Sequence, residues 1–392
     1  MTHNADLLDN DLYNFTMQNA ILDHFPDTLV KYKFIDRQHN KYSDGFLKSF
    51  THEVEALSTA TVKSEHLALL KRKAPYLDRH YFAYLHDYRY DPNELSYGIN
   101  ADGEFWLEIS GLWATTKLWD VPLLARISET YLDINTNMQP TLSDGYSDRL
   151  SQNIRKAHRL DSHGCQFAEF GTRRRRDQNI QNEVISCLKQ YPSFRGTSNV
   201  MLGLRHGVPL VGTMAHEWIM GVSAIDGLVA ANRCALHRWN ETFKGNLGIA
   251  LTDTFGTDAF FKDFDGELAR LYDGVRHDSG DPIEFGHRAI DHYEKLGIKP
   301  TKKMVVFTDA LTVDKAIKIQ QEFEGSIGVS FGIGTHFTND LPGVRPMNIV
   351  IKLIECNHMP VVKLSDEPGK ATGDKDALRV ARWTFNRIPL NA

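Results

Sequence analysis

The sequence predicts an α/β fold built on a parallel sheet, either open or closed into a barrel, with a second domain beside it. Two observations indicate this class. From about residue 195 onward, short apolar runs alternate with helical stretches, as in parallel strands joined by helices. The chain also has 392 residues, which suits two domains, or one barrel with an added domain, better than a single compact unit.

The first 130 residues are predicted to mix helices and strands. Apolar side chains recur at helical spacing over residues 7–25, and residues 29–35 alternate apolar and charged side chains as a strand does. Residues 105–109 and 113–119 show the same strand-like pattern, and residues 121–135 are predicted to form a helix. No low-complexity linker and no short tandem repeat interrupts the sequence.

Five short apolar runs are the predicted parallel strands of the second half. The best helix candidate between them begins at Pro282, and Gly297 follows its last turn. The five runs are residues 208–212, 247–251, 271–275, 304–307 and 327–331.

The last stretch, from about residue 345, has a different pattern. Its apolar runs, residues 348–354 and 360–364, are predicted to pair as a hairpin. A hairpin does not continue a parallel sheet, so we expect this tail to pack on the N-terminal domain. The predicted organisation is an N-terminal α+β domain of residues 1–130 plus 345–392, and an α/β domain of residues 131–344.

Composition excludes several classes of protein. Hydrophobic residues make up 42% and charged residues 24% of the chain, as in globular proteins with a sizeable core. The 45 basic and 50 acidic residues give a net charge of -5, which argues against nucleic-acid binding. No apolar run reaches the roughly 18 residues of a membrane span, and residues 1–10 lack a signal-peptide pattern. We therefore expect no membrane partner and a cytoplasmic location.

The four cysteines are Cys165, Cys187, Cys234 and Cys356. They are widely spaced and include no CxxC pair, which favours reduced thiols over a disulfide scaffold or a structural zinc site.

Polar clusters follow the predicted strands, where parallel α/β folds place their ligand sites. A single polar strand end would mean little, but five in succession favour a catalytic face over a purely structural series. The clusters are residues 212–218, 252–256, 276–281, 308–309 and 332–335, with a further one at 169–176.

Three of these clusters offer acid–base chemistry. His216 follows the first strand and Asp253 the second, so the carboxylate can orient the imidazole, although a lone histidine is more often structural. Asp278 and Asp281 can hold ribose hydroxyls, bind Mg²⁺ or stabilise a cationic sugar. Asp281 is explained equally well as the N-cap of the helix that begins at Pro282.

Two further clusters can hold anions. The Gly-x-Gly of residues 332–334 lets backbone N–H groups approach a phosphate, although such a turn is more often only tight. The arginine run 173–176, next to Phe170, can bind a carboxylate or phosphate while the ring stacks on a flat ligand, or it is a solvated face. No Walker A motif is present, so any use of ATP relies on another kind of site.

Taken together, these motifs resemble the nicotinate phosphoribosyltransferases of the bacterial type. The likeness covers nearly the whole chain, and its specificity lies in the order and spacing of many segments. The matching segments are residues 8–13, 16–17, 170–175, 212–217, 251–255, 276–282, 331–335 and 348–369.

The resemblance implies a fold and a reaction. The fold is the irregular, funnel-like α/β barrel of type II phosphoribosyltransferases, with an α+β N-terminal domain completed by the C-terminal tail. The reaction joins nicotinate to the phosphoribosyl group of 5-phosphoribosyl 1-pyrophosphate (PRPP), using Mg²⁺ and coupled ATP hydrolysis, as the first step of NAD salvage. This would make the chain an ATP-dependent ligase. The resemblance also allows a homodimer in which Tyr13 serves the neighbouring subunit's site.

The resemblance further implies roles for single residues, without identifying the ligands of Mg²⁺. The proposed catalytic residues are His216, which ATP phosphorylates, Asp253, which orients it, and Asp278 on the ribose side. The proposed substrate-binding residues are the ring-stacking Tyr13 and Phe170, then Arg173, Arg276, Asp309, Gly334 and Thr335 around the phosphates.

Four other functions compete with this one. A nicotinamide phosphoribosyltransferase would share the site, but the arginine run 173–176 favours a carboxylate, and no acidic residue is evident beside Tyr13 or Phe170 to bind an amide. A quinolinate phosphoribosyltransferase is generally shorter and needs no phosphorylated histidine. A catalytically silent metabolite-binding barrel would not need the full set of polar strand ends. A glycosidase would need Asp278 and Asp281 on opposite sides of a sugar.

Overall fold

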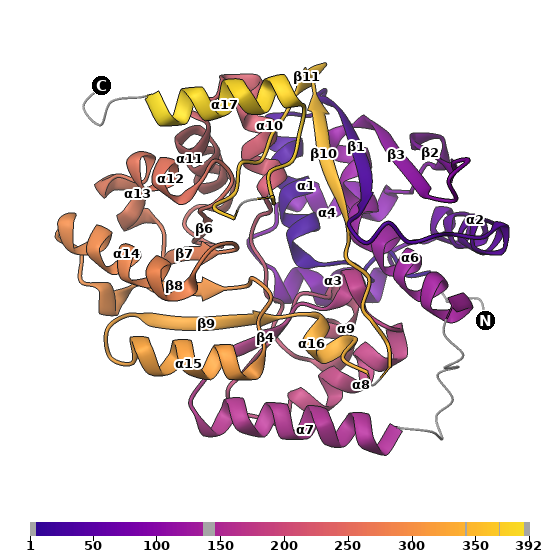
Figure 1. Cartoon of the computed structure of the whole chain (residues 1–392), viewed down its shortest axis with the longest axis horizontal. Coiled ribbons are helices and arrows are strands. Elements are labelled where there is room, and N and C mark those ends of the chain that lie inside the picture. The colour runs from indigo at the N-terminus through magenta and orange to yellow at the C-terminus, as the bar shows by residue number, and fades with distance from the viewer. Residues whose placement is uncertain (1–4, 136–145, 342, 368, 388–392) are drawn as a thin grey trace.

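The computed structural model describes residues 5–135, 146–341, 343–367 and 369–387. It contains two sheets, one antiparallel and one parallel, with helices packed around them (Figure 1). Some parts of the predicted domains lie outside the described residues: residues 1–4, 136–145, 342, 368 and 388–392.

The N-terminal sheet is antiparallel and includes the C-terminal tail. Its strands run in the order β11-β10-β1-β3-β2. The central strand β1 pairs with β3 on one side and β10 on the other, so the tail completes the N-terminal domain as predicted (Figure 1). The strands are β1 (Leu29–Asp36), β2 (Leu95–Ile99), β3 (Phe105–Leu112), β10 (Ile349–Cys356) and β11 (Met359–Pro360).

Helices cover this sheet and link it to the second one. The helix predicted over residues 7–25 begins only at Leu12, because Asp11 is extended and pairs with Asn199 across a bridge. The elements are α1 (Leu12–His24), α2 (Asp44–Ser58), α3 (Ser64–Lys73), α4 (Arg79–Asp87), η1 (Pro92–Glu94), α5 (Trp113–Thr116), η2 (Lys117–Trp119) and α6 (Asp120–Asn135).

The strand predicted over residues 113–119 was wrong, because α5 and η2 occupy this segment. The hydroxyl of Thr116 donates to the carbonyl of Leu112, which favours a helical turn at the end of β3. The alternating pattern misled because Lys117 is fully buried beside Glu217 rather than exposed.

The second sheet is parallel throughout, with the strand order β5-β4-β9-β8-β7-β6. Four of its strands match predicted runs, whereas β4 and β5 were missed. The strands are β4 (Phe167–Glu169), β5 (Phe194–Thr197), β6 (Ile249–Leu251), β7 (Gly274–His277), β8 (Met304–Phe307) and β9 (Gly328–Ile333).

The first predicted strand of this sheet, residues 208–212, was wrong in detail. The segment lies next to β5 but makes only a single bridge, between Leu210 and Thr197. Pro209 has no N–H to donate to a ladder, and its carbonyl accepts from the amide of Thr197. The segment lies between the two edge strands of the sheet, because it bridges to β5 at Leu210 and the hydroxyl of Thr213 donates to the carbonyl of Ile249 in β6 at 3.4 Å. It thereby closes the sheet into an irregular barrel.

Helices follow the parallel strands and form the outer layer of the barrel. The helix predicted at Pro282 is confirmed as α14. The elements are α7 (Tyr146–Ser162), η3 (Thr172–Arg174), α8 (Gln178–Leu188), α9 (Val200–His206), α10 (His216–Asp226), α11 (Ala231–Phe243), α12 (Thr257–Asp263), α13 (Gly266–Leu271), α14 (Pro282–Lys295), η4 (Pro300–Lys302), α15 (Val313–Phe323), α16 (Thr335–Thr338) and α17 (Lys375–Arg387).

Within the described part of the chain, no single helix is long and apolar enough to cross a membrane. Helices α10 and α11, which meet at a bend, have the length and apolar composition of a span only when the two are taken together. Seven residues of α10 are buried in the fold. The four cysteines are free, with Cys165, Cys187 and Cys356 buried.

Candidate active site

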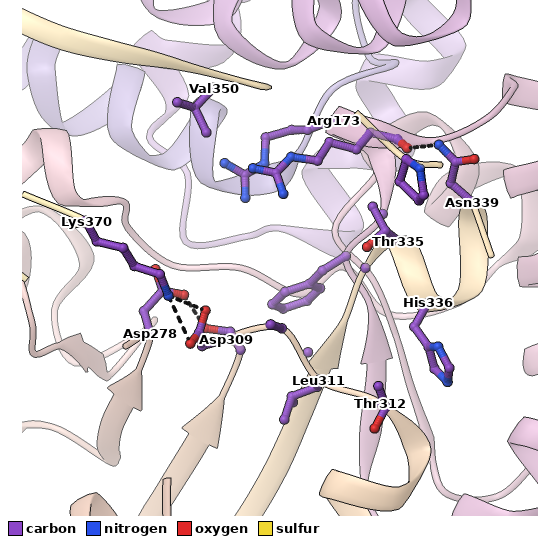
Figure 2. Close-up of a pocket in the computed structure, with 18 of the residues that line it drawn as sticks. Arg173, Asp278, Asp309, Leu311, Thr312, Thr335, His336, Asn339, Val350 and Lys370 are labelled. Carbon is purple, nitrogen blue, oxygen red and sulfur yellow. Dashed lines mark hydrogen bonds and ion pairs between the residues drawn. The ribbon is translucent and has the colours of Figure 1, made fainter. Parts of the chain in front are cut away.

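Two adjoining cavities lie where the carboxyl ends of the parallel strands meet β10 of the other sheet. The larger has a volume of about 450 Å³ and the smaller about 110 Å³. The residues that line both cavities, and so mark their junction, are Phe170, Arg173, Arg276, Asp278 and Lys352. Figure 2 shows the larger cavity, with Asp278, Asp309 and Lys370 on one side and Thr335 and His336 on the other.

The smaller cavity is a slot between aromatic side chains. Tyr13 of α1 and Phe170, which follows β4, both line it. The Tyr13 hydroxyl donates to Asp120 at 2.6 Å, and the ammonium of Lys117 lies 5.3 Å from the centre of its ring. These contacts fix the tyrosine ring, and both aromatic residues belong to the same chain.

The position of Phe170 depends on a glycine. A Cβ atom added to Gly332 of β9 would lie 2.5 Å from the Phe170 ring. Only glycine lets this ring lie so close to the strand. The Gly-x-Gly of residues 332–334 therefore shapes the aromatic slot as well as the larger cavity, which Gly334 and Thr335 line.

The arginine run divides into two pairs. Arg173 and Arg174 line the larger cavity. Arg175 is fully buried instead, and its guanidinium binds Asp9 at 2.7 Å and Glu129 at 2.6 Å. Arg176 is likewise buried and binds Asp133 at 2.7 Å. The expectation of one anion patch or one solvated face over all four residues was therefore wrong.

His216 begins α10 and meets two carboxylates. Its Nε2 atom lies 2.8 Å from Asp253 Oδ1 and 3.6 Å from Asp278 Oδ2. Burial, together with the charge of Lys363, lowers the pKa of His216 to about 4. The imidazole is therefore neutral near pH 7, with its Nε2 proton directed at Asp253 and the Nδ1 lone pair left for other chemistry.

Asp278 lies at the junction of the cavities and is held by two neighbours. Its Oδ1 atom accepts from Arg276 at 2.9 Å and from the hydroxyl of Thr308 at 2.6 Å. Burial acts to raise the pKa of Asp278, but the neighbouring basic groups, Arg276 first among them, together outweigh it and hold the pKa well below its usual range. The carboxylate is therefore negative at pH 7.

Asp281, three residues further on, has the structural role that the sequence also allowed, as the N-cap of a helix. Its carboxylate accepts from the amides of Ile283 and Glu284, at 2.9 and 2.8 Å, as the N-cap of α14. It does not line either cavity.

The tail after β11 forms one wall of the site. Lys363 binds Asp253 Oδ2 at 2.9 Å. Lys370 binds both oxygens of Asp309, at 3.0 and 3.1 Å (Figure 2). Ser365 donates to the hydroxyl of Ser279 at 2.9 Å. The segment thus ties the C-terminal part of the chain to the ends of β6, β7 and β8.

Sequence reasoning missed several residues of this site. Asp11 and Asp120 line the aromatic slot, so the expectation of no acidic residue near Tyr13 was wrong. Asp11 accepts from the hydroxyl of Ser198 at 2.8 Å. Lys352 gave the clearest signal, because it is the lone basic residue in the apolar run of β10.

A cation can be held by only some of the acids here. His216, Asp253 and Asp278 offer ligand atoms within 4.8 Å of one another. Both Asp253 oxygens are already engaged, one by His216 and the other by Lys363, which disfavours a cation beside them. Among the described residues, Asp278 Oδ2 has only its long contact with His216, so Asp278 is the better ligand. Asp309 of the same cavity could join it only by giving up its contacts with Lys370.

Known proteins match this chain along nearly its full length. The model of the nicotinate phosphoribosyltransferase (NAPRTase) family matches residues 165–388, and the model of its N-terminal domain matches residues 8–128. The nicotinate phosphoribosyltransferase of Methanosarcina acetivorans is 43% identical, over 98% of this chain and 99% of that protein. The protein of the same name from Chromohalobacter salexigens is 44% identical, over 96% of this chain and 97% of its own.

Solved structures agree with the sequence matches. The crystal structure of nicotinate phosphoribosyltransferase from Porphyromonas gingivalis superposes with a TM-score of 0.94, at 36% identity, over 97% of this chain and 99% of that one. The structure from Vibrio cholerae gives 0.92, at 35% identity, over 98% and 94%. Because both family models and full-length relatives match, the chain belongs to the nicotinate phosphoribosyltransferase family.

Proposed function

We propose that this chain transfers the phosphoribosyl group of PRPP to nicotinate, forming nicotinate mononucleotide and pyrophosphate in the first step of NAD salvage from nicotinate. One observation carries the proposal: a narrow aromatic slot opens, at Asp278, into a larger cavity lined by cations. A flat pyridine ring suits the slot, and the phosphates of PRPP suit the cavity.

The proposed transfer needs little acid–base chemistry. The lone pair of the pyridine nitrogen forms the bond to the sugar carbon, while the electron pair of the breaking C–O bond leaves with the pyrophosphate. The sugar gains positive charge between these events, and the ionised Asp278 at the junction stabilises it. Tyr13 and Phe170 hold the ring in line with the bond that breaks.

His216 is then free for a second role, which we propose is coupling to ATP. Asp253 holds the Nε2 proton, so the Nδ1 atom of the neutral ring accepts the γ-phosphoryl group and ADP leaves. The new negative charge lies at the N-terminus of α10, where backbone N–H groups and the helix dipole favour it. Hydrolysis of the phosphohistidine resets the site. This coupling would place the enzyme among the ATP-dependent ligases.

Mg²⁺ is a proposed partner of the pyrophosphate group. Asp278 and Asp309 would hold it, because both carboxylates line the larger cavity. When bound it supplies positive charge that offsets the charge of the phosphates. Asp309 would have to exchange its contact with Lys370 for the cation.

Nicotinamide is the alternative base, and the acids of the slot give it a specific basis. An amide N–H₂ could donate to Asp11 or Asp120. Both already accept a hydroxyl, from Ser198 and Tyr13 respectively. Arg173 lines the same slot and favours a carboxylate.

We propose that the chain forms a homodimer and that it is located in the cytoplasm. Tyr13 and Phe170 of one chain share a slot, so each subunit would have its own pair of rings. Sedimentation of the purified chain would test the assembly, and cell fractionation would test the location.

The first experiment is pyrophosphate release from PRPP and Mg²⁺, with nicotinate or nicotinamide, each with and without ATP. We expect release with nicotinate that rises with ATP. Release only with nicotinamide would move the assignment to the amide, and release without an ATP effect would remove the phosphohistidine step. No release with either base would contradict the proposed function.

A further inference from the structure

Lys352 is a lysine in an otherwise apolar strand. It lies in β10 (Ile349–Cys356), where it follows three buried residues and precedes the buried Leu353. Its cross-strand partner in β1 is Lys33. Directly opposed like charges destabilise an antiparallel pair, so sheet stability does not explain a lysine at this position.

The side chain of Lys352 lies where the two cavities join. It lines both of them, as do Arg173, Arg276 and Asp278. Arg276 is paired with Asp278 at 2.9 Å, whereas Lys352 forms no ion pair within the described part of the chain. The junction therefore carries surplus positive charge beside the carboxylate assigned to the sugar.

We propose that Lys352 is a further catalytic residue, whose ammonium binds the pyrophosphate group of PRPP as it leaves. This inference rests on the proposed function. When the sugar–oxygen bond breaks, its electron pair stays on the pyrophosphate oxygen, which gains one unit of negative charge. Lys352 keeps its proton and forms an ion pair with that group, while the pyridine nitrogen supplies the electrons of the new bond. A fixed cation near the point where charge develops lowers the barrier.

The carboxylate of nicotinate is the other anion that Lys352 could bind. This carboxylate carries one negative charge, which is fewer than the positive charges at the junction. Repulsion among Lys352, Lys363 and Arg173 is better relieved by a group with several negative charges, which favours the pyrophosphate. The two anions give different kinetic results, so the experiment below separates them.

The electrostatic surroundings support this assignment. Burial, followed by repulsion from Lys363 and Arg173, lowers the pKa of Lys352 to about 8. The charged groups around it are Lys33 of β1, Arg173 of η3, Lys363 of the tail, Asp278 after β7 and Asp120 of α6. A bound anion would favour the protonated form. Pyrophosphate affinity should therefore decrease as pH rises through 8.

The test compares Lys352→Met, Lys352→Arg and the matched control Lys33→Met. Binding of inorganic pyrophosphate with Mg²⁺ is measured by calorimetry, and turnover by pyrophosphate release. We expect Lys352→Met to weaken pyrophosphate binding about 10-fold and to lower kcat about 100-fold, with the KM for nicotinate little changed. Lys352→Arg should restore binding and show no decrease near pH 8. Lys33→Met should match the native chain.

Two results would overturn the inference: unchanged pyrophosphate binding in Lys352→Met, or a loss confined to the KM for nicotinate. A circular dichroism spectrum and melting curve show whether each variant is folded, and Lys352→Arg provides the test if Lys352→Met is not. Calorimetry needs no turnover, so it separates the two proposals. If the native chain bound pyrophosphate through Lys352 but released none from PRPP, only the proposed function would be contradicted.

Discussion

The arginine run 173–176 places positive charges in two different surroundings, a buried network and an open cavity. Arg175 binds Asp9 and Glu129 and is fully buried, with Arg126 of α6 also next to these acids. Arg174 lines the open cavity, and its Nε atom donates to the backbone carbonyl of Ile349 at 3.1 Å. Burial, with repulsion from Arg173 and Arg37, lowers the pKa of Arg174 to about 10.

The difference separates charges that stabilise the fold from charges held for a ligand. In the buried network, each cation has a carboxylate that compensates the loss of water. In the cavity, Arg174 and Lys352 form no ion pair among the described residues, and burial lowers the pKa of both, which costs stability unless an anion binds. We therefore expect substitutions in the two regions to affect different measurements.

The largest expected effect is on folding. Arg175→Met leaves Asp9 and Glu129 buried with only the Arg126 guanidinium to compensate two carboxylates, which should lower the free energy of unfolding by about 3–5 kcal/mol. Arg174→Met removes a repelled charge and should change it by less than about 1 kcal/mol. Urea denaturation of both variants measures the difference. Equal losses would contradict the division of the run.

The sequence predicted most of the barrel and much of the site, but it did not predict this division. Neighbouring arginines are chemically identical in a sequence, and only η3 directs two of them to the cavity and two to the interior. His216 and Asp253 were predictable as neighbours because both follow strands of one parallel sheet. Asp120 was not, because it begins a helix more than 100 residues after Tyr13 in the chain, and no sequence pattern indicates that the two side chains meet.

The missed strands have a similar cause. The strands β4 and β5 are short, and unlike the equally short β6 they are not apolar runs: β4 ends in Glu169, and β5 contains Arg195 and Gly196. The segment after Val208 has a strand-like composition, but Pro209 prevents a regular ladder.

The next largest effect should be on turnover, and it compares two aspartates three residues apart. Asp278→Asn removes the charge at the cavity junction and should lower kcat about 100- to 1000-fold. Asp281→Asn should leave kcat unchanged, since asparagine also caps helices well. Pyrophosphate release with nicotinate measures both. A large loss in Asp281→Asn would place that carboxylate in the chemistry after all.

A smaller effect should appear in nicotinate binding when the aromatic slot is disturbed. Gly332→Ala places a methyl group 2.5 Å from the present position of the Phe170 ring, which must move. Overpacking of this kind costs about 1–3 kcal/mol, so we expect the KM for nicotinate to rise about 10-fold. Gly45→Ala is the control, because its nearest neighbour is 3.5 Å away. An unchanged KM would mean that Phe170 does not position the base.

A pH-dependent effect concerns Glu169, which lies between the two regions. It is fully buried, accepts from Thr197 at 2.7 Å and from Gln181 at 3.0 Å, and immediately precedes Phe170. Gln181 also accepts from Arg175, so the glutamate links the buried network to the slot. Burial, only partly offset by these hydrogen bonds, raises the pKa of Glu169 from 4.5 to about 7.

The sign of the pH dependence follows from that raised pKa. Between pH 4.5 and 7 the folded state binds this proton more tightly than the unfolded state, so the contribution of Glu169 to stability decreases as pH rises. The slope is at most about 1.4 kcal/mol per pH unit. Glu169→Gln stays uncharged and should remove this part of the slope, which urea denaturation at pH 5, 6 and 7 would measure. If the variant kept the native slope, another buried group would be the one that titrates. Glu169 would then be ionised at neutral pH, as a charged member of the buried network.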